Sequence, residues 1–207
     1  MTNKEIRAEI KHKLDIEPDG SKIAVLGLQG SGKTYFTKRL LKIYKRPIVF
    51  QVNKDDQYQQ DRGALVYQAE APSEFFKFIN FIQPIIKKQA ESKERKIDCL
   101  VIDEADLYLS NNFVVNGNDF FNDLVANHRH YGISMIFISR RPQDISTKVL
   151  ESCKHLVIFP LQGANAKKKM NDIYEGMGNM VYRMKYKDYS FIYKKIGEAP
   201  VILPKVK

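Results

Sequence analysis

The sequence predicts an α/β fold in which helices cover both faces of a mainly parallel sheet. Apolar runs typical of buried strands alternate with segments whose apolar residues recur at helical spacing. The runs are KIAVLGL (22–28), PIVFQV (47–52), IDCLVID (97–103), ISMIFIS (133–139) and HLVIFPL (155–161). Single cores hold roughly 100 to 250 residues, so we expect one domain over residues 1–207.

The helices are expected between these runs. A charged amphipathic start predicts a short helix up to Leu14, and YFTKRLLKIYK (35–45) has apolar residues at helical spacing. SEFFKFINFIQPIIKKQA (73–90) has one apolar face with a kink expected at Pro84, and residues 117–131 predict a further helix. The tail YKDYSFIYKKIGEAPVILP (186–204) predicts a hairpin on a sheet edge.

Composition restricts the class of partner and the compartment. The net charge of +10 favours nucleic acid, although a basic surface can also serve solubility alone. The excess is concentrated in a basic extension, about residues 161–207, where 10 Lys and Arg face 4 Asp and Glu. Cys99 and Cys153 lack metal-ligand spacing and are expected as buried thiols. Neither a membrane-spanning run nor a signal peptide is evident, which predicts a cytoplasmic protein without membrane insertion.

A phosphate-binding loop follows the first apolar run. GLQGSGKT (27–34) matches the Walker A pattern between a strand and an amphipathic helix. The pattern needs glycines so that successive N–H groups can turn toward phosphates, while Lys33 reaches the β- and γ-phosphates and Thr34 holds Mg²⁺. The residues expected to bind the nucleotide are Gly27, Gln29, Gly30, Ser31, Gly32, Lys33, Thr34 and Tyr35.

Two acids follow the strand CLVI and resemble a Walker B element. Asp103 is expected at the carboxyl edge of the sheet, beside the loop, as a ligand of Mg²⁺. Glu104 is expected to polarise the attacking water, which favours hydrolysis over phosphoryl transfer to a metabolite. Two acids that only cap a loop are the structural alternative.

Arginine stabilises the charge that develops on the γ-phosphate, and two segments offer one. Arg140 and Arg141 directly follow the strand 133–139 and are expected near Asp103. Arg129 precedes that strand, where a helix end also favours a basic residue for its dipole alone. All three arginines are candidate catalytic residues.

Two segments of the basic extension each allow two interpretations. KKK (167–169) is either a contact with a DNA backbone or a solvated helix face. The Tyr–Lys alternation at 182–195 is either a stacking surface or a half-buried hairpin.

The series GLQGSGKT, LVIDEAD and RHYGISMIFISRRPQDI resembles the FtsK–HerA superfamily of DNA-pumping ATPases, and specifically its viral genome-packaging members. The resemblance covers about residues 22–160, the expected motor core. It implies a RecA-like (ASCE) P-loop NTPase fold. It also implies an arginine, near Arg129, that is supplied to the neighbouring subunit. Where the family has Gln before RP, this chain has Arg140, which leaves the γ-phosphate sensor open.

We therefore expect a Mg²⁺-dependent ATPase that translocates double-stranded DNA, and the resemblance implies that the DNA enters a viral capsid. The resemblance implies a homo-oligomeric ring of five or six subunits, capsid or vertex proteins as partners, and a place in the host cytoplasm or the virion. Two alternatives stay open at this point. A P-loop kinase of a small metabolite would have an Arg-rich lid and no need of Glu104. An ATP-switched DNA-binding or partition protein would turn over slowly without a ring.

Overall fold

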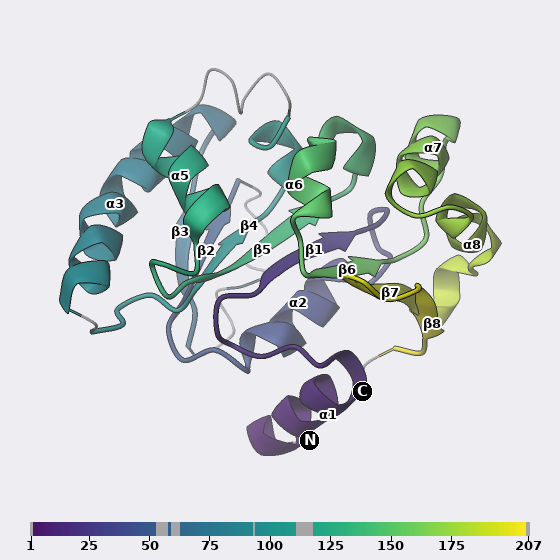
Figure 1. Ribbon diagram of the computed structural model, residues 1–207, viewed down its shortest axis with the longest axis horizontal. Helices are drawn as coiled ribbons and strands as arrows, with labels where there is room; N and C mark the ends of the chain where they lie inside the picture. Colours follow the sequence, from purple (N-terminus) through teal and green to yellow (C-terminus); the bar gives the residue numbers. More distant parts are fainter. Residues whose placement is uncertain (1, 53–57, 59–62, 93, 111–117, 206–207) are drawn as a thin grey trace.

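The computed structural model describes residues 2–52, 58, 63–92, 94–110 and 118–205. Within these residues, the strands form one sheet of eight in the order β3-β2-β4-β5-β1-β6-β7-β8 (Figure 1). The strands are β1 (Lys22–Leu26), β2 (Pro47–Gln51), β3 (Leu65–Gln68), β4 (Cys99–Ile102), β5 (Ser134–Ser139), β6 (His155–Ile158), β7 (Phe191–Lys195) and β8 (Val201–Leu203). Neighbours from β3 to β6 are parallel, and β6–β7 and β7–β8 are antiparallel.

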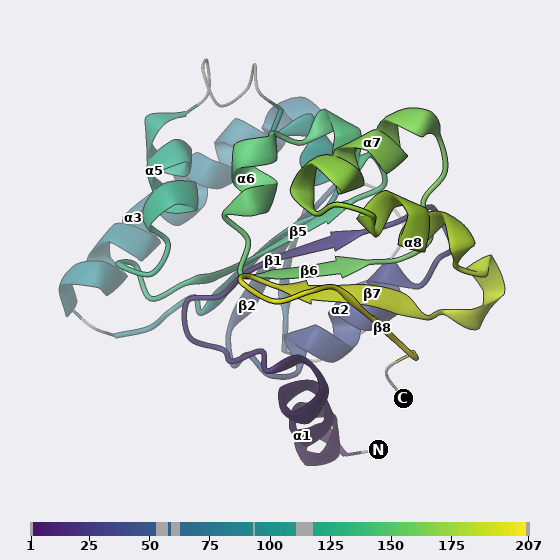
Figure 2. The same cartoon turned by 45° about the vertical axis from the view of Figure 1, so that its right-hand side comes forward.

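Helices cover both faces of the sheet (Figures 1 and 2). One face carries α3 (Phe75–Ser92), α5 (Asp119–Asn127), α6 (Thr147–Glu151), α7 (Ala164–Ile173) and α8 (Met177–Arg183). The other carries α1 (Asn3–Leu14) and α2 (Lys33–Leu41). Short 3₁₀ turns are η1 (Pro72–Glu74), η2 (Ala105–Leu107), η3 (Pro142–Asp144) and η4 (Tyr186–Asp188). The buried side chains accordingly form two clusters, one on each face.

The first helix is specified by its own sequence. The Thr2 side chain accepts from the Glu5 N–H at 3.3 Å, and the Glu5 carboxylate accepts from the Thr2 N–H at 2.7 Å. This reciprocal capping satisfies two donors that a helix start otherwise leaves unpaired. Ile6, Ile10 and Leu14 are buried, so α1 packs its apolar face against the cluster that also contains α2.

The position of β5 determines where the functional segments meet. β5 pairs with β1 on one side, with Leu26 opposite Ser139, and with β4 on the other, with Ile102 opposite Phe137. The three parallel strands therefore end at one edge, where ligands bind in open α/β sheets. The loop after β1, the acids after β4 and the arginines after β5 all lie along this edge.

The structure confirms the predicted sheet, α1 and the terminal hairpin, and both cysteines are buried free thiols. The predicted helix 117–131 was too long: α5 ends at Asn127, and Gly117 lies outside the described residues. Strand β3 was not predicted, because its four residues are half-exposed at the sheet edge. The basic extension is no separate layer, since β7 and β8 continue the same sheet. Across the described ranges, no helix has the length and apolarity that crossing a bilayer requires.

The ring of Phe50 is the centre of an aromatic cluster beneath the acidic loop. It lies 5.1 Å from Phe75 and 5.5 Å from Tyr108, between ring centroids, and is fully buried. We predict that Phe50→Ala lowers the free energy of unfolding by about 3–5 kcal/mol, because truncation leaves a cavity in a packed core. Urea denaturation measures it. Phe81→Ala, at a ring that is 52% exposed, is the matched control, and an equal loss there would contradict the assignment.

Candidate functional site

The loop between β1 and α2 has a backbone that requires glycine. Gly27, Gly30 and Gly32 have φ of 153°, 73° and 107°, values that side chains rarely allow. Neighbours also leave no room: a Cβ on Gly27 would lie 2.6 Å from the Cβ of Phe159, and one on Gly30 would lie 2.7 Å from the Tyr186 hydroxyl. Because these three positions carry no side chains, the backbone N–H groups of the loop are accessible to a ligand.

The loop is held by strands on both sides of β1. The Gly27 N–H donates to the Ser139 carbonyl and the Leu28 N–H to the Pro160 carbonyl, each at 3.1 Å. Helix α2 then begins at Lys33, so its unpaired N–H groups and positive dipole end point at the loop. The arrangement is a preformed cradle for an anion such as phosphate.

The Lys33 ammonium is bent back over this cradle. Its Nζ donates to the Leu28 carbonyl at 2.8 Å, and the side chain is buried. Burial lowers the pKa of Lys33 to about 8, and the charge of Asp103 opposes that decrease. An anion placed in the loop would restore the ammonium's preference for its charged form. Thr34 follows in the first turn of α2 and is partly buried.

Asp103 lies at the end of β4 and is held by main chain. Its N–H donates to the Phe50 carbonyl at 3.0 Å, and its Oδ1 accepts from the Glu104 N–H at 2.9 Å. Burial raises the pKa of this carboxyl to about 6, while the Glu104 N–H and the charge of Lys33 act in the opposite direction. Mg²⁺ prefers hard oxygen donors. The shielded Asp103 carboxylate beside the phosphate cradle is one such donor, and the Thr34 hydroxyl is another, so the residues present fit that ion.

Glu104 has a strained backbone and a charged partner. Its φ of 51° and ψ of 44° place it in the left-handed region, which is uncommon for a residue other than glycine. Its Oε1 lies 2.5 Å from the Arg140 Nη2, and the Glu104 side chain is only 17% exposed. Strain of this kind clusters at functional sites. The pair joins the end of β4 to the end of β5.

A second contact joins the same two loops. The Ser139 hydroxyl donates to the Asp106 carboxylate at 2.6 Å and accepts from the Arg141 N–H at 2.9 Å. The Arg141 side chain itself is exposed. The acids after β4 and the arginines after β5 therefore form one hydrogen-bonded edge.

Arg129 lies at the other end of the sheet. Its Nε donates to the Gly20 carbonyl at 3.3 Å, next to the buried His128, whose Nε2 lies 3.0 Å from the same carbonyl. Gly20 precedes β1, whereas the phosphate loop follows it. Arg129 is thus not brought together with Lys33, Asp103, Glu104 and Arg140 within one subunit.

An aromatic pocket of about 330 Å³ adjoins the phosphate loop. Its lining residues are Gly32, Tyr35, Phe36, Phe159, Tyr189, Phe191 and Lys205. Tyr35 was predicted at the site; its ring carries the Arg39 guanidinium at 5.1 Å from the centroid. Sequence reasoning did not place the members after residue 158 at the nucleotide site, because only the sheet order brings β6 and β7 beside the loop.

Comparisons with known proteins show a family match and similar folds. A family model described as an AAA domain matches residues 17–145. The fold resembles the genome packaging NTPase B204 from Sulfolobus turreted icosahedral virus 2 in complex with AMP, with TM-score 0.71 and 19% identity over 90% of this chain and 98% of that chain. It also resembles VirB4 of Thermoanaerobacter pseudethanolicus, with TM-score 0.64 and 10% identity over 91% of this chain and 89% of that chain.

The packaging ATPase B204 from Sulfolobus Turreted Icosahedral Virus gives TM-score 0.71 at 20% identity, over 90% of this chain and 97% of that chain. No curated protein sequence matches the chain. The structural matches confirm the P-loop NTPase fold, and they include packaging ATPases of Sulfolobus turreted icosahedral viruses, as the resemblance in the motifs predicted.

We predict that Asp103→Asn stabilises the metal-free protein at pH 7 by about 1–3 kcal/mol. The folded pKa of about 6 exceeds the ordinary value of 3.8. Between pH 3.8 and 6 the Asp103 carboxyl is therefore protonated in the native state and ionised in the unfolded state. As the pH rises through this range, the native state loses stability, because the buried carboxyl must ionise. Urea denaturation in EDTA at pH 3.5 and pH 7 measures it. A variant less stable than wild type at pH 7, or equally stabilised at both pH values, would contradict the prediction.

Proposed function

This chain belongs to the AAA domain family, and we propose that it is a Mg²⁺-dependent ATPase that translocates double-stranded DNA, as genome-packaging motors do. One observation carries the hydrolytic part of the proposal. Glu104 follows the metal-site acid Asp103 at the sheet edge and is paired with Arg140 at 2.5 Å. A carboxylate and an arginine beside a phosphate cradle are the pair that water attack on a γ-phosphate needs.

The phosphate loop would bind the triphosphate through its main-chain N–H groups from Gly27 to Lys33. Lys33 would leave the Leu28 carbonyl for the β- and γ-phosphates, which offer full negative charge in place of a neutral oxygen. Thr34 and Asp103 would hold Mg²⁺, which neutralises charge on the β- and γ-phosphates when bound. Burial of these groups strengthens each interaction, because the local dielectric is low.

Arg140 and Glu104 would exchange partners when nucleotide binds. The Arg140 guanidinium donates to the Glu104 carboxylate. A γ-phosphate would draw Arg140 toward itself, and the Glu104 carboxylate could then orient a water for attack. Arg140 would thus replace the Gln that the family has before RP. Arg141, fixed through its N–H to Ser139, would contact phosphate from the same edge or from a neighbouring subunit.

The aromatic pocket would hold the base of ATP. Phe159 and Tyr189 lie 3.3 and 3.1 Å from a Cβ built on Gly32, so the pocket begins at the loop itself. Flat aromatic walls favour stacking of a planar base. This supports a nucleotide, rather than free phosphate, as the ligand.

Arg129 would serve the site of a neighbouring subunit in a ring of five or six. Arg129 and the phosphate loop lie at opposite ends of β1. Arg129 contacts Gly20, which precedes this strand, whereas the phosphate loop follows it. A site that lacks this arginine within its own subunit is completed by assembly. Ring formation would also enclose DNA, and the net charge of +10 suits a phosphate backbone contacted without base readout.

The biological setting is proposed from the relatives. B204 is described as a genome packaging NTPase and a DNA-packaging ATPase. By analogy, the partners of this chain would be double-stranded DNA and capsid or vertex proteins, and it would act in the host cytoplasm or remain with the virion. Residues of about 22–160 would form the motor core.

We predict that Glu104→Gln lowers ATP turnover at least about 100-fold, because it removes the group that activates water, while the Kd for ATP stays within about threefold. Phosphate release with and without double-stranded DNA measures turnover. DNA should stimulate the wild type at low salt, and less as salt rises. Glu94→Gln, at an exposed ion pair with Lys96, is the control. Phosphate transfer to a nucleoside without any effect of DNA would contradict the motor and favour a kinase.

Tyr189→Ala should weaken ATP binding about tenfold, because one stacking wall is worth about 1 kcal/mol or slightly more. Binding of inorganic tripolyphosphate, which has no base, should not change. Titration calorimetry measures both affinities, and Tyr182→Ala is the control, since its ring is 45% exposed against 46% for Tyr189. Equal losses for ATP and tripolyphosphate would place Tyr189 outside the base site.

A further inference from the structure

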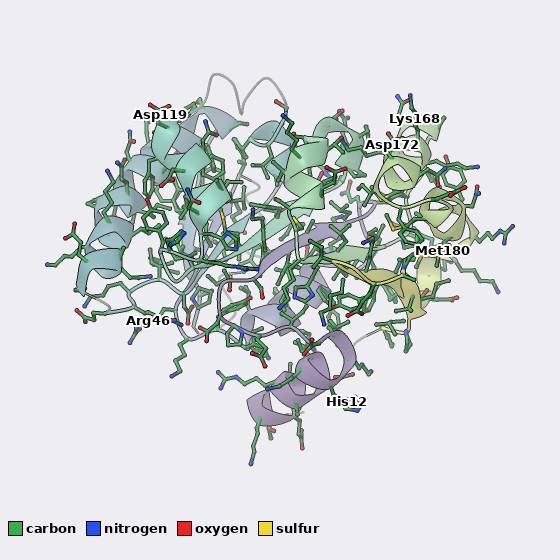
Figure 3. All side chains as sticks on the ribbon, in the orientation of Figure 1. His12, Arg46, Asp119, Lys168, Asp172 and Met180 are labelled. Atoms are coloured by element: carbon green, nitrogen blue, oxygen red, sulfur yellow. The ribbon has the colours of Figure 1, made fainter. Side chains whose placement is uncertain are left out.

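Residues 164–188, which comprise α7, α8 and η4, form a segment we call the basic segment. It has six Lys and Arg and three Asp and Glu, a net charge of +3. Among the basic residues, Lys168, Arg183, Lys185 and Lys187 are exposed. Figure 3 shows Lys168 and the acidic Asp172 on α7, at the opposite side of the molecule from Arg46. The acids Asp172, Glu175 and Asp188 are exposed as well.

Exposed tyrosines lie among these charges. Tyr174, Tyr182 and Tyr186 are 38%, 45% and 43% exposed. The Lys167 ammonium lies 5.5 Å from the centroid of Tyr182, and the Lys194 ammonium lies 5.7 Å from that of Tyr174. Lysine, arginine and tyrosine hydroxyls are the side chains that contact phosphate and sugar in DNA complexes without reading sequence. The surface therefore fits a nucleic-acid backbone.

The two helices of the segment pack tightly against each other. Gly178 of α8 packs so closely on α7 that an added Cβ would lie 2.3 Å from the Lys167 carbonyl oxygen. The Gly178 N–H also donates to the Asn171 Oδ1 at 2.8 Å. A displacement of α7 would consequently carry α8 with it.

Lys169 fastens this unit to the loop after β5. Its ammonium is buried and donates to the Ile145 carbonyl and the Thr147 Oγ1, each at 2.7 Å. Lys169 is thus neither a solvated residue nor a DNA contact, in contrast to the sequence-based alternatives for KKK (167–169). Only four residues separate Arg140 from Ile145, so a shift of Arg140 toward a γ-phosphate would reach the anchor of α7 directly.

Tyr186 fastens the other end of the segment to the phosphate loop. Its hydroxyl donates to the Gln29 carbonyl, and its oxygen would lie 2.7 Å from a Cβ on Gly30. The segment therefore contacts both loops that would enclose the γ-phosphate.

We propose that the exposed face of the basic segment contacts the DNA backbone, and that Lys169 and Tyr186 are positioning residues that make this contact follow the state of the nucleotide. The inference rests on the proposed function and names the surface that the motor uses. It favours DNA over an acidic protein, because the cations alternate with tyrosine rings.

Binding of a fluorescent 30-base-pair duplex, followed by anisotropy from low to moderate salt, tests the surface. Arg183→Ala/Lys185→Ala/Lys187→Ala should weaken binding at least about tenfold and lower the salt slope by about 2–3, since each phosphate contact contributes about 0.9. The control Lys45→Ala/Arg46→Ala/Lys88→Ala removes the same charge from other exposed positions and should retain most of the slope.

Equal effects of both triple variants would overturn the inference, since the binding would then be long-range attraction alone. Displacement of the duplex by polyglutamate at equal charge would also overturn it, in favour of an acidic protein partner. A wild type that binds no DNA even at low salt would contradict the proposed function itself, which is a distinguishable result.

Lys169→Met tests the coupling. Its DNA affinity should equal that of the wild type, whereas the ratio of DNA-stimulated to DNA-free turnover should fall toward one. Thr147→Val removes one of the two acceptors, keeps the ammonium anchored by Ile145, and should give an intermediate ratio in a folded protein. An unchanged ratio in Thr147→Val and in folded Lys169→Met would overturn the coupling.

Discussion

The hydrogen bond from the Gly27 N–H to the Ser139 carbonyl joins the phosphate loop to the strand that ends in the arginines. It exists because β5 lies between β1 and β4, so that three parallel strands end at one edge. Everything proposed for the site depends on this order. A sheet in which β4 adjoined β1 would leave Arg140 and Ser139 away from the space between the loop and the acids.

The side chains along this edge are the charged groups that would contact a nucleotide and its metal. The Lys33 ammonium donates to the neutral Leu28 carbonyl, and Arg140 forms an ion pair with Glu104. The shielded carboxyl of Asp103 has a pKa of about 6. A magnesium–triphosphate complex would offer each of these groups a partner of opposite charge. The left-handed backbone of Glu104 indicates that local strain is tolerated in order to hold this carboxylate in place. The basic segment, tied to both loops, would extend such a rearrangement to the surface.

Local sequence signals predicted much of the fold and the centre of the site. Glycine spacing, apolar runs and acids at a strand end are short-range patterns, and they predicted that the loop, Asp103 and Glu104 lie at one edge of the sheet, as the structure has them. The aromatic pocket could not be predicted, since Phe159 and Tyr189 reach Gly32 only through the pairing of β6 with β1 and β7. The burial of Lys169 within a run of three lysines was equally hidden, because composition does not distinguish a solvated ammonium from one that anchors a loop.

Hydrolysis that moves duplex DNA is the central claim, and displacement of a third strand measures it most directly. A duplex carrying a fluorescent triplex-forming oligonucleotide is incubated with the protein and ATP, and release of the oligonucleotide is followed over time. The account predicts release that requires ATP hydrolysis and stops with a non-hydrolysable analogue. Rapid, DNA-stimulated hydrolysis without release of the third strand would contradict it.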